Sequence, residues 1–152
     1  MTNGLVSIIM PSFNCGQYIE ETVSSVRNQT YQDWELIFFD DFSKDDSLKI
    51  IKKIQLSDNR IKVYSNDVNS GAAVTRNRAL REAKGRWIAF LDSDDIWEPT
   101  KLEKQVKFME ENNLSFSYTG YQEIDEKSNV TGVFVSGPNQ VSKIGMFAFC
   151  WP

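Results

Sequence analysis

The sequence has no histidine and only two cysteines among its 152 residues. The absence of histidine excludes Ser/His/Asp triads, histidine acid/base catalysis and histidine metal sites. Cys15 and Cys150 lie far apart and outside any Cys-x-x-Cys or Cys/His pattern, so neither zinc binding nor redox chemistry is indicated. A reducing cytoplasm is the expected location, and any catalysis must depend on carboxylates.

Excess basic charge and long apolar runs are also missing. Lys and Arg number 17 against 21 Asp and Glu, and this net charge of −4 leaves no basic stripe for a nucleic-acid partner. No apolar stretch approaches the roughly 20 residues of a membrane helix, and the N-terminus lacks the positive start of a signal peptide. We therefore expect no membrane span, while peripheral attachment at the inner membrane face stays open.

Hydrophobic residues make up 41% of the chain, which fits one α/β domain with a sizeable core. Short apolar runs alternate with amphipathic stretches, a pattern typical of βαβ units around a mainly parallel sheet. Strands are expected at 5–10, 34–39, 61–64 and 87–91, the first ending at Pro11, and helices at 16–28, 45–55, 72–83 and 99–112. Residues 114–124 and 130–135 predict an antiparallel or mixed hairpin. The tail, 141–152, is apolar to its end, so we expect the chain to stop inside a larger fold.

Acidic residues form two clusters, each directly after an apolar run: 40–46 and 92–95. Ligands of open parallel sheets bind outside the carboxyl ends of the strands, so both clusters could face one crevice. The Asp-x-Asp of residues 92–94 suits a Mg²⁺ or Mn²⁺ ion that clamps a diphosphate. An acidic surface turn or helix cap explains that pattern equally well, and Asp45 and Asp46 are predicted to be helix caps.

Other residues near these clusters suit a nucleotide. Asp40 and Asp41 can accept hydrogen bonds from the N–H of a base or from ribose hydroxyls. Gly71 permits close backbone approach, and Arg76 on the following helix suits bidentate phosphate contact. Arg78 and Arg81 are predicted to be solvated.

Four ordered motifs, PSFN (11–14), DDFS (40–43), NSGAAVTRN (69–77) and LDSDD (91–95), closely resemble the nucleotide-binding half of the family 2 glycosyltransferases over about residues 6–109. The resemblance implies the GT-A fold, an α/β/α arrangement with a mainly parallel sheet and a mixed or antiparallel C-terminal part. It further implies an inverting, Mn²⁺- or Mg²⁺-dependent hexosyltransferase of polysaccharide biosynthesis. The donor would be a UDP-sugar, preferred by family frequency, and the acceptor a glycan or lipid-linked sugar. Residues 1–152 would form a single domain, with donor-binding units in 1–112 and the first acceptor-side strands in 113–152.

By similarity, the donor site comprises Pro11, Phe13, Asn14, Asp40, Asp41, Asn69, Gly71, Arg76, Asp92 and Ser93. Asp41 would pair with the nucleobase and Arg76 would approach the base or diphosphate. Asp94 would hold the metal together with Asp92, which also contacts the ribose or sugar. Phe42 stands where the family more often has glycine, so the local turn is expected to differ.

Inversion needs a base that takes the proton of the acceptor hydroxyl. The family carries this acid further downstream, so we expect the base and acceptor site beyond Pro152 and interpret Asp125 and Glu126 as turn residues. Two alternatives remain: a non-catalytic nucleotide-sugar-binding module and a Mg²⁺-dependent receiver-like phospho-acceptor domain. Receivers carry an acid pair after their first strand, where this chain has Pro11 and Asn14.

Overall fold

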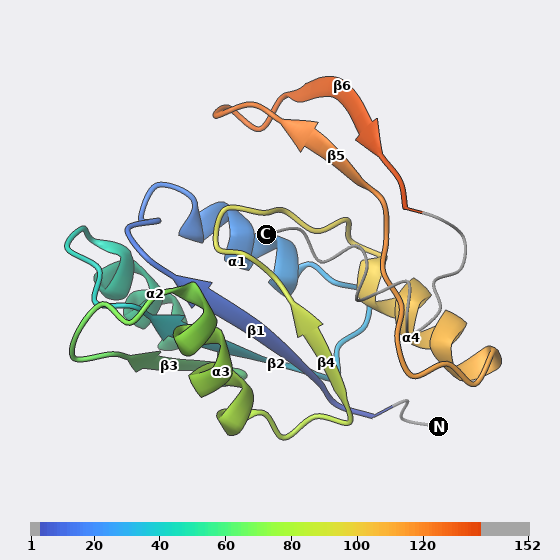
Figure 1. Cartoon of the computed structure of the whole chain (residues 1–152), viewed down its shortest axis with the longest axis horizontal. Coiled ribbons are helices and arrows are strands. Elements are labelled where there is room, and N and C mark those ends of the chain that lie inside the picture. The colour runs from blue at the N-terminus through green and yellow to red at the C-terminus, as the bar shows by residue number, and fades with distance from the viewer. Residues whose placement is uncertain (1–3, 138–152) are drawn as a thin grey trace. The chain divides into compact units, whose positions relative to one another are not determined.

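The computed structural model describes residues 4–137, in a chain that divides into two compact units, Met1–Asn112 and Asn113–Pro152. The first unit contains a four-stranded parallel sheet in the order β3-β2-β1-β4 (Figure 1). Its strands are β1 (Val6–Ser12), β2 (Trp34–Asp40), β3 (Ile61–Ser65) and β4 (Trp87–Phe90). The expected α/β class with a mainly parallel sheet is confirmed.

Helices cover the two faces of this sheet. Helices α1 (Ile19–Arg27), α2 (Ser47–Gln55) and α4 (Lys101–Glu111) share one core cluster with strand residues such as Phe38. Helix α3 (Ala72–Glu82) crosses the other face, where Ala79 packs with Ile9 and Ile37 (Figure 1). Because successive strand side chains point to opposite faces, strands covered on both sides need apolar residues in succession, as β1 has at Ile8–Met10 and β2 at Leu36–Phe39.

Strand β1 continues through Pro11, where the sequence predicted its end. The Ile9 carbonyl accepts the Leu91 N–H, whereas the Ser12 carbonyl accepts the Asp41 N–H beyond β2. Pairing with β4 stops at Ile9 and pairing with β2 continues to Ser12, so Pro11 removes no bond of the β4 ladder. The prediction failed because Pro11 lies past the end of the β4 pairing, where its missing N–H removes no hydrogen bond of the sheet.

Some other boundaries differ from the expected ones. Helix α1 begins at Ile19 rather than near residue 16, because the Tyr18 and Ile19 N–H groups donate to the Cys15 carbonyl in a separate turn. Helix α4 begins at Lys101, and Pro99 lies before it with its carbonyl accepting the Thr30 N–H. Strand β4 ends one residue early, at Phe90.

The second unit contains an antiparallel hairpin of β5 (Tyr121–Ile124) and β6 (Val130–Val135). Strand β5 is much shorter than the expected 114–124. The Asp125 carboxylate accepts the N–H groups of Lys127 and Asn129, which agrees with the turn role expected of Asp125. The apolar tail, 141–152, lies outside the described residues.

The helices in the described part of the chain are short. They contain 9 to 11 residues and extend about 14–17 Å at a rise of 1.5 Å per residue. Within residues 4–137, none has the length and apolar character needed to cross a bilayer.

Candidate functional site

The loops that follow β1 and β2 are joined at the carboxyl edge of the sheet. The Asn14 N–H donates to Ser43 Oγ at 2.9 Å, and Asn14 Oδ1 accepts the Lys44 N–H at 2.8 Å. Asn14 adopts a positive φ of 52°, which asparagine tolerates better than most residues. Pro11 is buried in β1, whereas Phe13 is exposed beyond it. Asn14 therefore has a structural contact in addition to its predicted role in a base pocket.

The two acids at the end of β2 have different surroundings. Asp40 is 2% exposed and its Oδ2 accepts the Ser43 N–H at 2.9 Å. Its Oδ1, like Ser12 Oγ on the neighbouring strand, is buried without a hydrogen-bond partner among the described residues. Asp40 thus closes the turn after β2, and its contact with a nucleotide stays a prediction.

Asp41 instead fixes the loop that leads into α3. Its Oδ1 accepts the Ser70 N–H at 2.7 Å and the Asn66 Nδ2 at 2.7 Å, and its Oδ2 accepts the Gly71 N–H at 2.8 Å. Burial raises the pKa of Asp41, but the hydrogen bonds from Ser70, Asn66, Gly71 and Thr75 outweigh burial and leave the pKa below its usual value. The carboxylate is therefore held ionised as an acceptor.

Gly71 caps α3 with a φ of 83°, a conformation that glycine adopts without strain. A Cβ at this position would meet no atom within 4 Å, so backbone conformation rather than space requires the glycine. Asn69 is exposed two residues earlier. The structure thus places the NSG motif at the start of α3, close to Asp41.

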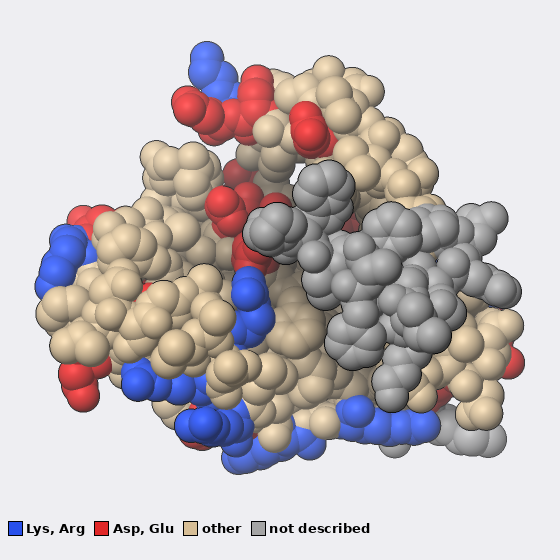
Figure 2. Space-filling view, in the orientation of Figure 1, with Lys and Arg blue, Asp and Glu red and all other residues tan. Residues whose placement is uncertain are grey.

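A cation from α3 meets an acid that follows β4. Arg76 Nη2 donates to Asp92 Oδ1 at 2.7 Å, and the two side chains are 34% and 58% exposed. Both line a pocket of about 300 Å³ with Phe90 and Asp95. Figure 2 shows acidic and basic side chains meeting near the centre of this face. The structure therefore brings together two of the predicted site residues, Arg76 and Asp92.

The acids after β4 form a tight turn, in which the Asp95 N–H donates to the Asp92 carbonyl at 3.2 Å. Burial raises the pKa of Asp95, and the charges of Asp94 and Asp92 raise it further. Asp94 is exposed, whereas Ser93 is buried and its carbonyl accepts the Thr22 hydroxyl at 3.1 Å. Ser93 thus anchors the turn to α1 while the carboxylates stay at the surface.

The acids of this turn could bind a divalent cation only together with ligands from elsewhere. Within residues 4–137, no group of three or more Asp, Glu, Cys or His side chains forms a complete metal cage. Mg²⁺ and Mn²⁺ commonly accept one or two carboxylates and complete their shell with substrate phosphates and water. Asp92 and Asp94 can supply those carboxylates, with Asp95 beside them.

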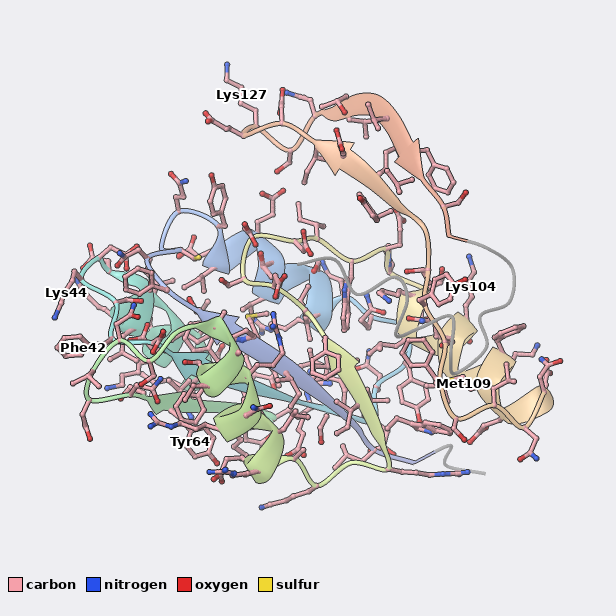
Figure 3. The ribbon with its side chains drawn as sticks, viewed as in Figure 1. Phe42, Lys44, Tyr64, Lys104, Met109 and Lys127 are labelled. Atoms are coloured by element: carbon pink, nitrogen blue, oxygen red, sulfur yellow. The ribbon has the colours of Figure 1, made fainter. Side chains whose placement is uncertain are left out.

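Phe42 has a backbone conformation that glycine would adopt more easily. Its φ is 64°, and the Lys44 ammonium lies 3.2 Å from the centroid of its ring (Figure 3). Phenylalanine thus takes a left-handed conformation here, and a difference from the family's usual turn stays a prediction.

Asp45 caps the start of α2 with its side chain. Its carboxylate accepts the N–H groups of Ser47 and Gly16, at 3.0 and 2.9 Å. Asp46 occupies the N-cap position without a side-chain hydrogen bond.

Sequence reasoning missed several contacts around the site. Asn66 and Thr75 were not singled out, yet they are buried beside Asp41 and joined by a hydrogen bond. Arg78 was predicted to be solvated, which is wrong, because its guanidinium donates to Asn66 Oδ1. Asp95 directly follows the Asp-x-Asp of residues 92–94, so its place beside the pocket could have been predicted from the sequence. No comparable pattern marks Asn66.

Solved structures resemble the fold of this chain. The structure of S. aureus TarS 1–349 in complex with UDP-GlcNAc has a TM-score of 0.66 and 33% sequence identity, over 71% of this chain and 32% of the TarS 1–349 chain. The neighbours are GT-A glycosyltransferases, which confirms the expected fold class.

Proteins similar in sequence to this chain are named as glycosyltransferases. The putative teichuronic acid biosynthesis glycosyltransferase TuaG of Bacillus subtilis is 46% identical over 144 residues, covering 93% of this chain and 57% of TuaG. The Escherichia coli UDP-Glc:alpha-D-GlcNAc-diphosphoundecaprenol beta-1,3-glucosyltransferase WfgD is 49% identical over 136 residues, covering 90% of this chain and 53% of WfgD. The chain therefore spans about half the length of these relatives.

The receiver-like alternative needs acids after the first strand, and the structure has Phe13 and Asn14 there. The profile described as Glycosyl transferase family 2 matches residues 7–136, and this match includes all four motifs. The chain belongs to glycosyl transferase family 2.

Proposed function

We propose that this chain is the donor-binding part of an inverting glycosyltransferase that takes a sugar from a UDP-sugar and transfers it to a glycan or lipid-linked acceptor. The observation that carries the proposal is the Arg76–Asp92 ion pair beside a 300 Å³ pocket at the carboxyl edge of a parallel sheet. This edge is where α/β sheets bind nucleotides. The UDP and UDP-GlcNAc complexes of TarS support a uridine donor.

Arg76 is suited to bind the donor diphosphate. A guanidinium carries five N–H donors, and the ion pair of Arg76 with Asp92 uses one nitrogen, so donors remain for phosphate oxygens. Asp92 lies close enough to the same pocket to accept a hydroxyl of the ribose or sugar. Asp41, held ionised by its hydrogen bonds, is the proposed acceptor for an N–H of the base.

Asp92 and Asp94 are the proposed ligands of Mn²⁺ or Mg²⁺. The bound ion would neutralise negative charge on the diphosphate leaving group. Because the described residues supply no complete cage, we expect firm metal binding only when the donor phosphates complete the site.

The acceptor step requires groups outside this site. Inversion needs a carboxylate that removes the acceptor proton, and Asp125, engaged in the hairpin turn, does not meet this need. We place the base and the acceptor site beyond Pro152. A diphosphoundecaprenol acceptor, as in the name of WfgD, would bring the whole enzyme to the cytoplasmic face of the membrane.

Calorimetric titration tests this proposal directly. UDP is titrated into the chain with Mn²⁺, then with EDTA, and then into the Asp94→Asn variant with Mn²⁺. Asp46→Asn is a matched control, because this exposed acid removes the same charge away from the pocket. We expect binding to need both the metal and Asp94 and to be unaffected by the control. Folded protein that binds none of UDP, GDP and dTDP would overturn the assignment of a donor site.

A further inference from the structure

We propose that Asn66, oriented by Arg78, is a positioning residue for the Asp41 carboxylate. This inference rests on the proposed function, because it concerns how the donor site presents its acceptor for the base. Neither Asn66 nor Arg78 belongs to the expected donor-site set, and both act through hydrogen bonds within the protein.

Asn66 follows β3 and is 4% exposed. Its Nδ2 donates to Asp41 Oδ1 at 2.7 Å and to Thr75 Oγ1 at 2.8 Å, and its Oδ1 accepts from the Arg78 guanidinium. Its backbone N–H donates to the Asp40 carbonyl at 2.8 Å. The side chain therefore joins the end of β2 to α3 with all its polar atoms in use.

An amide is the group that these neighbours require. The side facing Asp41 must donate, because a carboxylate offers only acceptors, and the side facing Arg78 must accept, because a guanidinium offers only donors. Arg78 thus determines which way the amide points: with its oxygen on the cation, the nitrogen must face Asp41. A carboxyl of the same shape would satisfy Arg78 but place acceptor against acceptor at Asp41.

The consequence for the site concerns the orientation of the Asp41 carboxylate. Asn66 and the Ser70 N–H donate to Oδ1, the Gly71 N–H donates to Oδ2, and a hydrogen bond from Thr75 also helps to keep Asp41 ionised. Asn66 therefore holds the carboxylate in one orientation, in which the proposed function has it accept an N–H from the pairing edge of a base.

The Asn66→Asp variant tests this arrangement because it keeps the size and shape of the side chain. Asp41 and Arg78 are the ionisable side chains hydrogen-bonded to Asn66. At pH 7.5 we expect UDP affinity to fall at least about tenfold, the size of one charge-assisted hydrogen bond. Near pH 5 a proton shared by the two carboxyls restores the donor, so part of the affinity returns relative to wild type. A residue needed only for stability would show no such return.

Amide hydrogen exchange at Ser70 and Gly71 provides a readout without ligand. We expect faster exchange of both in Asn66→Asp at pH 7.5, after correction for intrinsic rates, with partial recovery near pH 5. Arg78→Ala should also accelerate exchange and Arg78→Lys should do so less. Asn59→Asp, an exposed position on the loop before β3, controls for the added charge, and Arg81→Ala controls for a lost cation on α3.

The two proposals fail separately. If wild-type protein does not bind UDP but the amides of Ser70 and Gly71 exchange faster in the variants, the donor site is overturned and the positioning role is supported. Wild type that binds UDP, combined with an Asn66→Asp variant that binds equally well and keeps both amides protected at pH 7.5, would overturn the positioning role.

Discussion

Arg76 Nη2 lies 2.7 Å from Asp92 Oδ1, so a cation on α3 and an acid after β4 meet beside the pocket that Phe90 and Asp95 also line. Both side chains are partly exposed, and ion pairs of this kind contribute only up to about 1 kcal/mol to stability. The pair therefore adds little to stability, and under the proposed function its main effect is on donor binding in this pocket.

Replacing Arg76 by alanine should weaken UDP binding without unfolding the protein. We expect a loss of roughly tenfold in affinity, because a charge-assisted phosphate contact disappears, and a change of less than about 1 kcal/mol in the free energy of unfolding. Calorimetry and urea unfolding measure the two quantities. Arg81→Ala, an exposed position on the same helix, should change neither. Equal UDP affinity in Arg76→Ala and wild type would remove Arg76 from the site.

Phe42 permits a test of backbone strain. Both Phe42→Gly and Phe42→Ala remove the ring and its contact with Lys44, but only glycine accepts a φ of 64° without strain. We expect the glycine variant to be more stable than the alanine variant by about 1 kcal/mol, the cost of the left-handed conformation. Urea unfolding at neutral pH measures this difference. A more stable alanine variant would mean that the turn is not strained.

Asp58 should make the protein sensitive to acid. Hydrogen bonds from Arg60 are the main reason that the pKa of Asp58 lies below its usual 3.8, although burial opposes them. A depressed pKa stabilises the folded state fully above 3.8, and this contribution is lost as the pH falls through the folded pKa. Asp58→Asn should therefore cost about 2 kcal/mol at pH 7, and its difference from wild type should shrink below pH 3.8.

Urea unfolding of both proteins between pH 2 and 7 follows the Asp58 difference, with exposed Asp46→Asn as the control. A difference that stays constant across this range would show that the charge of Asp58 is not involved.

Gly85 should tolerate no side chain. A Cβ there would lie 2.6 Å from both the Leu5 carbonyl oxygen and the Ser7 nitrogen, and 2.8 Å from Ser7 Oγ. Gly85→Ala should cost about 1–3 kcal/mol by overpacking. Because two of the three atoms are backbone, adding Ser7→Ala should not restore stability. Recovery in the double variant, measured by urea unfolding, would contradict this.

The sheet could be predicted because covered parallel strands have a strong pattern. Runs such as 36–39 are continuously apolar and end in acids, which located both the strands and the edge where the candidate site lies. Strand β5 was predicted too long, because its exposed residues carry little burial pattern to mark where the strand begins.

The contacts within the site were harder to predict. The Arg76–Asp92 pair joins residues 16 positions apart, and the two positions could be anticipated from motifs but their contact could not. Asn66 and Arg78 depend on one another through side-chain hydrogen bonds that leave no periodic signal. Adjacent acids also have unlike roles, since Asp40 closes a turn while Asp41 holds the loop before α3.

Paramagnetic NMR tests the central claim most directly, because Mn²⁺ broadens the signals of nearby amides. We would add a small amount of Mn²⁺ to the isotope-labelled chain in the presence of excess UDP and record which backbone signals vanish. The account predicts broadening centred on residues 92–95, extending to Arg76, and much weaker effects in Asp94→Asn or without UDP. Broadening centred elsewhere, such as the acids of 123–126, or none that depends on UDP, would contradict it.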